Sequence, residues 1–112
     1  MNAYEIPNLR FSLPAGAEVA RNRFVSVDAS GNCVQATAAT PVIGASMNST
    51  KAGQVAEIAD GIVMVEASGA ITAGVAVYSD AVGKATATGT TNAAGITVTA
   101  ATGEGSLVAV KI

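Results

Sequence analysis

The sequence contains no histidine and no tryptophan, and its only cysteine is Cys33. Histidine is the side chain that most often acts as a general base or a metal ligand near neutral pH, so its absence weighs against both kinds of site. A single cysteine cannot form an internal disulfide, and without a histidine it lacks the base that activates a catalytic thiol. Because small and apolar residues surround Cys33, we predict that it is a buried structural thiol.

Charged residues are scarce. They make up 12% of the chain, about half the usual share, and the net charge is −2. Because nucleic-acid binding needs a basic face, we expect no direct nucleic-acid partner. The acidic residues are scattered over strand ends and turns, and the spacing of Glu57 and Asp60 does not suit a paired general acid and base. We therefore expect no enzymatic activity, no cofactor and no metal site.

Long hydrophobic runs are missing as well, although half of the residues are hydrophobic. No apolar run reaches the ~18–20 residues of a membrane-spanning helix, so we expect no membrane partner. The chain is instead rich in small and β-branched residues arranged in short alternating segments, a pattern typical of strands. Segments 24–28, 34–36, 41–47, 55–58 and 62–66 fit strands, and Asp60-Gly61 between the last two predicts a hairpin. The best helical candidate, residues 15–21, is short.

The first fifteen residues differ from the rest because they combine larger side chains with two prolines. Leu9, Phe11 and Leu13 alternate with polar residues, as in a half-buried strand. Proline excludes a long helix and limits strand pairing to an edge. We therefore predict an extended N-terminal arm at residues 1–15, followed by a single β domain at residues 16–112.

The β domain contains an internal repeat. One copy runs through F-V-S-V-D-A-S-G, P-V-I-G-A-S and K-A-G-Q-V-A, and the other through V-A-V-Y-S-D-A-V-G, N-A-A-G-I-T and G-E-G-S-L-V. Regularly spaced glycines indicate equivalent turns, because glycine adopts positive φ readily. The glycine pairs are Gly31 with Gly83, Gly44 with Gly95, and Gly53 with Gly105, at offsets of 52, 51 and 52 residues (83−31, 95−44, 105−53). The pattern predicts an all-β fold, a small jelly-roll-like barrel or sandwich with two similar halves of approximate two-fold character.

The segment G-I-V-M-V-E-A-S-G-A-I-T-A-G-V-A-V resembles the glycine-rich hairpins of biotinyl and lipoyl carrier barrels. Those domains carry a modified lysine at a hairpin tip, but the corresponding tip here, E-A-S-G-A, has none. The alternative that this resemblance leaves open is a non-enzymatic, β-rich binding module related to such barrels but without the modified lysine.

A resemblance over nearly the whole chain is to the capsid cement (decoration) proteins of tailed bacteriophages. Its most specific part is A-I-T-A-G-V-A-V-Y-S-D-A-V-G-K-A at residues 70–85, and it includes the closing L-V-A-V-K-I. One departure is Arg23, which stands where an acidic turn residue is expected. The resemblance implies a structural protein on the outer capsid surface of the virion, made in the host cytoplasm. It further implies that the protein binds the major capsid protein, stabilises contacts between capsid subunits and forms a homodimer or homotrimer.

Aromatic and arginine side chains often anchor protein interfaces, and the arm concentrates them. The residues that we predict to contact a partner are Tyr4, Ile6, Leu9, Arg10 and Phe11, with Arg21, Arg23 and Phe24 as secondary contacts. The competing interpretation is that Leu9, Phe11 and Leu13 complete the core of this chain.

Overall fold

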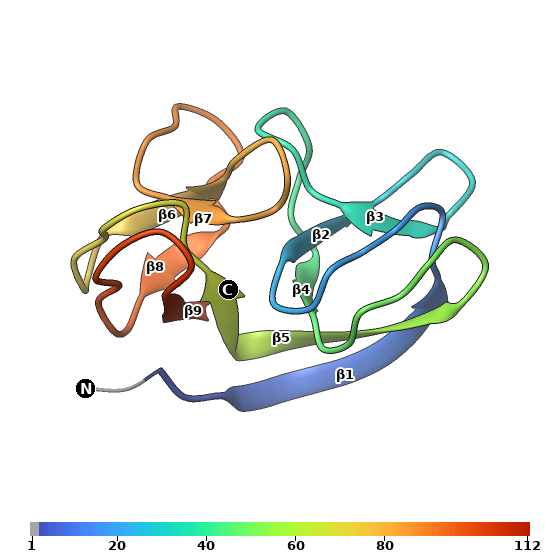
Figure 1. The fold of residues 1–112 in the computed structure, drawn as a ribbon, viewed down its shortest axis with the longest axis horizontal. Helices are drawn as coiled ribbons and strands as arrows, with labels where there is room; N and C mark the ends of the chain where they lie inside the picture. Colours follow the sequence, from blue (N-terminus) through green and yellow to red (C-terminus); the bar gives the residue numbers. More distant parts are fainter. Residues whose placement is uncertain (1–2) are drawn as a thin grey trace.

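The computed structural model describes residues 3–112, and within this range every regular element is a β-strand. All strand pairs are antiparallel, and the sheet curls into a half-barrel whose strand order is β3-β2-β4-β5-β9-β8-β6-β7, with β1 pairing β5 beside this path (Figure 1). The predicted all-β class is therefore confirmed. The strands are β1 (Ile6–Pro14), β2 (Phe24–Val27), β3 (Cys33–Gln35), β4 (Gly44–Ser46), β5 (Val55–Glu66), β6 (Ala76–Ser79), β7 (Ala85–Thr86), β8 (Gly95–Thr97) and β9 (Leu107–Lys111).

The predicted internal repeat is present and begins earlier than the glycines alone indicate. Arg10 on β1 pairs with Ala59 on β5, and Ile62 on β5 pairs with Lys111 on β9. Each residue of the second pair lies 52 positions after its equivalent in the first pair (62−10 and 111−59). The same offset holds along the rest of the two ladders. Residues 10–59 are called repeat 1 here and residues 62–111 repeat 2. The strand β1 is thus the first strand of repeat 1.

Equivalent turns in the two repeats are built in the same way. The Asp28 carboxylate accepts backbone N–H bonds two and four residues ahead, and so does the Asp80 carboxylate, at 2.9 Å in each case. Gly31 and Gly83 follow with φ of 81° and 82°, a region where a side chain costs about 1–2 kcal/mol. Short Asp-x-x-Gly sequences therefore specify both turns locally.

The hairpin predicted at Asp60-Gly61 is wrong, because β5 runs without interruption from Val55 to Glu66. Gly61 has a φ of 99°, but its positive φ accommodates a β-bulge opposite β1 and not a chain reversal. The two halves of β5 pair with different neighbours, β4 and β9, so one long strand serves both repeats. The helical candidate at 15–21 is also wrong: the segment is irregular and bridges residue 50 through Val19.

Two clusters of buried side chains form the core. The smaller cluster lies inside repeat 1 and includes Val25, Cys33 and Ile58, with Phe11 and Leu13 packed at its margin. The larger cluster lies inside repeat 2 but also receives side chains from the outer face of repeat 1, with Phe24 the largest of them. Burying a Phe side chain contributes about 1.5–3 kcal/mol, so the larger cluster joins the two repeats.

Cys33 is fully buried, as predicted. Burial raises the pKa of its thiol above the ordinary value of 9.0, because desolvation disfavours the thiolate. In the described part of the chain, no helix is long and apolar enough to cross a membrane.

Candidate binding surface

The strand β1 lies along one side of β5, and within residues 3–112 it pairs with no other strand (Figure 1). Its second edge is therefore open to solvent. Pro7 and Pro14 lie near the two ends of the strand, and since proline has no N–H, they reduce the hydrogen bonding that this edge can offer. Over residues 3–15, the predicted arm is thus an extended segment that packs on its own chain and keeps one free edge, while residues 1 and 2 lie outside the described residues.

A β-bulge interrupts the pairing of β1 between Pro7 and Arg10, where two residues of β1 lie opposite Asp60 of β5. The backbone N–H of Leu9 donates a 2.9 Å hydrogen bond to the Asp60 carboxylate. On the other strand Gly61 permits the close approach, because a Cβ there would lie 2.5 Å from the backbone nitrogen of Asn8. The bulge leaves the Leu9 side chain on the surface, 54% exposed.

The predicted contact residues of the arm divide into an exposed group and a packed one. Tyr4, Ile6 and Leu9 are exposed large hydrophobic residues, and Arg10 is exposed as well. These four residues are called the β1 surface here. Phe11 is half-buried against the smaller core cluster, as the competing interpretation expected of it. Leu13 packs there too, whereas Leu9 does not complete the core.

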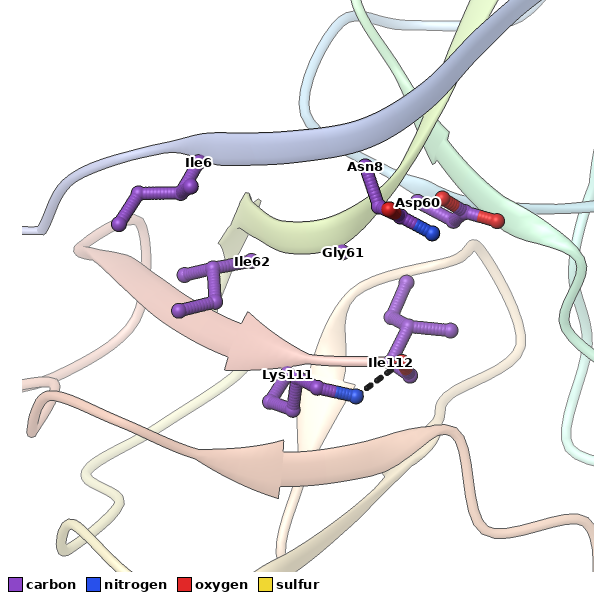
Figure 2. Close-up of a pocket in the computed structure, with 7 residues that line it drawn as sticks. All are labelled: Ile6, Asn8, Asp60, Gly61, Ile62, Lys111 and Ile112. Carbon is purple, nitrogen blue, oxygen red and sulfur yellow. Dashed lines mark hydrogen bonds between the residues drawn. The ribbon is translucent and has the colours of Figure 1, made fainter.

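A shallow hollow of about 450 Å³ lies next to the β1 surface (Figure 2). Its floor is apolar and comes from β1, β5 and the end of β9, while the Asp60 carboxylate and the Lys111 ammonium lie at its polar margin. Such a site suits an apolar side chain of a protein partner better than a multi-group cofactor, because few polar groups converge on it. The lining residues are Ile6, Asn8, Asp60, Gly61, Ile62, Lys111 and Ile112.

Two isoleucines on the outer face of the sheet, Ile62 and Ile96, were not predicted as surface contacts, although they adjoin the predicted contact Ile6. Ile6, Ile62, Lys111 and Ile96 are successive register partners across β1, β5, β9 and β8. They form a cross-strand row in which Ile6 is 58% and Ile96 is 53% exposed. Strand register decides this neighbourhood, since the four residues lie far apart in sequence.

Two of the three secondary contact residues, Phe24 and Arg23, make their contacts inside the chain. Phe24 is completely buried, so its side chain offers no surface to a partner in this conformation, and we do not keep it among the proposed contacts. The Arg23 guanidinium binds the Glu66 carboxylate through Nε and Nη2, at 3.1 and 2.9 Å, and donates to the Val82 carbonyl. Arg21 is exposed, and it lies outside the β1 surface. The departure at position 23 thus has a structural role: Arg23 joins repeat 1 to repeat 2.

Acidic residues and the cysteine do not gather into a possible metal site anywhere in residues 3–112. The β1 surface and the hollow beside it instead present apolar side chains next to a free strand edge, with a few charges at the margin. Such a surface can bind a protein through side-chain burial and main-chain pairing.

Comparison with known families gives this surface a context. A family model described as "Phage cement protein" matches residues 5–112. The chain belongs to this family. The fold is similar to a solved structure described as "The crystal structure of head fiber gp8.5 N base in bacteriophage phi29", with a TM-score of 0.75 and 21% identity over 93% of this chain and 92% of that chain. A search of curated proteins found no significant match.

Membership of the cement family makes the protein a structural protein of the bacteriophage virion. It bears out the predicted family resemblance, and it favours a cement protein over the carrier-like module.

Proposed function

We propose that this protein binds the outer surface of a phage head and stabilises contacts between neighbouring major capsid subunits. The observation that carries the proposal is the β1 surface, since a chain of a cement family here exposes Tyr4, Ile6 and Leu9 beside a free strand edge. Arg10 lies on the same strand and could pair with a carboxylate of the capsid. The protein is made in the host cytoplasm and then attaches to the capsid exterior.

The size of the β1 surface limits what one copy can achieve. A stable protein interface buries upwards of about 1,000 Å², which is more than one edge strand of nine residues supplies. We therefore also propose that the protein binds as a homodimer or homotrimer. Linking several weak contacts raises the overall affinity, because each later contact forms at a high effective concentration.

Point substitution tests the β1 surface better than deletion of the arm. Removing residues 1–13 would also remove Phe11 and Leu13 from the smaller core cluster, so lost binding and lost folding would be mixed. Leu9→Lys instead places a charge on an exposed site. Leu107→Lys is the matched control, because Leu107 is also an exposed leucine in a strand, at 40%, but lies on β9.

The assay adds purified protein to expanded heads that lack it and measures the number of bound copies against protein concentration. We expect Leu9→Lys to weaken binding about tenfold or more, since desolvating an unpaired charge costs over 1.4 kcal/mol, while Leu107→Lys binds like the unmodified chain. Decorated heads should resist heating better than bare heads. The proposal is wrong if the unmodified protein fails to bind, or if it binds without raising the thermal resistance of the heads.

A further inference from the structure

The two repeats contact each other through the outer face of repeat 1, which repeat 2 covers. The equivalent outer face of repeat 2 is exposed. In repeat 1, Phe24, Ala45 and Ala59 are fully buried and belong to the larger core cluster. Their counterparts in repeat 2 are Ala76, Ile96 and Lys111, and all three are exposed. Equivalent positions of one repeating backbone thus differ because repeat 2 covers repeat 1, while repeat 2 has no described neighbour on the same face.

The opposite face shows the reverse difference. Val63 and Val65 of repeat 2 are fully buried, because the outer face of repeat 1 packs over them. Their counterparts in repeat 1, Phe11 and Leu13, remain half-buried at the margin of the smaller cluster. Each chain therefore carries two unmatched faces, and they are the equivalents of the two faces that meet inside the chain.

A turn contact shows how closely the two repeats approach. The backbone N–H of Phe24 donates a 2.7 Å hydrogen bond to the Gly83 carbonyl, and a Cβ on Gly83 would lie 2.7 Å from the Phe24 carbonyl oxygen. A glycine is thus required at Gly83 by space as well as by φ. The counterpart, Gly31, has the same φ, but among the described residues no atom lies within 4 Å of a Cβ built there.

The strand edge that would receive the Gly31 turn is also available. The carbonyls of Val75 and Val77 accept hydrogen bonds from the β8 side, so the N–H and C=O of Ala76 between them point away from β8. The neighbouring strand β7 pairs with β6 only at Tyr78 and Ser79. The Ala76 edge is therefore the unoccupied equivalent of the Phe24 edge, which receives Gly83.

At the position of the internal Arg23–Glu66 ion pair, the two unmatched faces carry compatible side chains. Inside the chain, Arg23 of repeat 1 pairs with Glu66 of repeat 2. Their counterparts are Val75 and Pro14, both displaced by 52 residues (75−23 and 66−14). An ion pair in the internal contact is thus replaced at the open faces by two apolar residues, which leaves neither face with an unpaired charge at this position.

We infer that a second copy of this chain docks head to tail, with its repeat 2 outer face, which contains Ala76, Ile96 and Lys111, packed on the open face of repeat 1 and on the Gly31 turn. The inference rests on the homo-oligomer of the proposed function. The two faces lie toward opposite ends of the long axis of the molecule (Figure 1). Contacts between unlike faces close into a ring or continue as a filament. Of the two proposed assemblies, the trimer is such a ring, whereas a two-fold dimer pairs one face with itself.

The first test compares Ile96→Glu with Leu107→Lys by analytical ultracentrifugation of the purified chain over a range of concentrations. Each new charge faces an opposite charge on the adjacent strand, Lys111 or Glu66, so neither should disturb the fold by repulsion. Val55, the repeat 1 counterpart of Leu107, stays 57% exposed in spite of the internal contact, which places Leu107 outside the docking face. We expect Ile96→Glu to weaken self-association about tenfold or more and Leu107→Lys to leave it unchanged.

The second test uses two glycines with matched backbones. Gly31→Ala and Gly53→Ala both place a Cβ at a φ above 80° with open space around it, so their cost to folding should be similar. Only Gly31 lies in the predicted docking turn, and we expect only Gly31→Ala to weaken self-association. Mixing Gly31→Ala with Ile96→Glu should yield a heterodimer that grows no further, because each variant keeps one functional face.

Several outcomes would overturn the inference. They are an unmodified chain that stays monomeric at millimolar concentration, equal effects of Gly31→Ala and Gly53→Ala, and unchanged self-association in Ile96→Glu. Head binding is measured separately with Leu9→Lys, so a chain that self-associates but does not bind heads contradicts only the capsid proposal. A chain that binds heads while failing these tests contradicts only the docking proposal.

Discussion

Repeat 1 and repeat 2 share their strand pairing and turn chemistry but occupy different surroundings. Phe24 and its counterpart Ala76 make this plain, since one is completely buried and the other is exposed at the start of an equivalent strand. The ladder of β1 with β5 and the ladder of β5 with β9 are 52 residues apart, as from residue 10 to residue 62, and so are the Asp-to-backbone turns. Local sequence therefore sets the path of each repeat, while contact between repeats sets which side chains become core.

The arrangement of the two copies also differs from the approximate two-fold character that the sequence suggested. Gly83 contacts Phe24, but Gly31 makes no equivalent contact in the described chain. A two-fold axis would make such contacts reciprocal. The repeats instead follow one another head to tail along β5, whose first half ends repeat 1 and whose second half begins repeat 2.

The largest expected effect on stability is at Phe24. Phe24→Ala removes a buried aromatic ring from the junction between repeats, so we expect the free energy of unfolding to fall by about 3–5 kcal/mol. The reciprocal change Ala76→Phe lies on an exposed site and should alter it by less than about 0.5 kcal/mol. Urea unfolding of both variants, under dilute conditions where the chain is monomeric, measures the difference. Similar effects at the two positions would show that the repeats are equally covered in solution.

An intermediate effect is expected at the paired turn glycines. Gly83→Ala combines strain at positive φ with a clash against the Phe24 carbonyl, so we expect a loss of about 2–5 kcal/mol. Gly31→Ala has only the strain, which costs about 1–2 kcal/mol. Thermal unfolding at low protein concentration compares the two. Equal losses would mean that the internal turn contact adds nothing to stability.

The smallest expected effect concerns Cys33 and its counterpart Ala85. Cys33→Ala installs the residue found at the same position of repeat 2, and we expect it to cost about 1 kcal/mol, since one buried sulfur atom is removed. Burial raises the pKa of the Cys33 thiol above 9.0, so the native chain should react with a thiol reagent far more slowly than the urea-unfolded chain. Labelling rates followed by mass spectrometry give the comparison, and equal rates would contradict the burial.

The same shift predicts the sign of a pH effect. Below the ordinary pKa of 9.0, the thiol is protonated in both the folded and the unfolded chain. In that range Cys33 therefore adds no pH dependence to the free energy of unfolding. Above that value the unfolded chain loses the proton first, and the free energy of unfolding falls as pH rises. In Cys33→Ala this contribution to the alkaline loss of stability should be absent.

Much of the fold could be predicted because the signals were local. Alternating small residues indicated strands, the turn glycines indicated the repeat, and the apolar neighbours of Cys33 indicated its burial. The hairpin prediction at Asp60-Gly61 failed because a glycine with positive φ fits a bulge as well as a turn. Only the strands beside β5, which pair with it continuously across this point, decide between the two.

The candidate surface was predictable in part. The exposure of Ile6 and Leu9 agrees with a role in contact, whereas the burial of Phe24 and the internal ion pair of Arg23 were not visible in the sequence. Ile62 and Ile96 were missed, because they join Ile6 only through the register of four strands. Residue type predicts how well a side chain can anchor an interface, but not whether it remains on the surface.

By itself, the sequence determined the all-β class, the turns and the existence of two copies, because backbone preference at glycine, aspartate and β-branched residues acts over a few neighbouring positions. Tertiary structure alone decided that β5 is shared, that the copies pack head to tail, and which of two equivalent faces stays open. Those outcomes depend on pairing and burial between residues about fifty positions apart, where equivalent side chains such as Phe24 and Ala76 meet different neighbours.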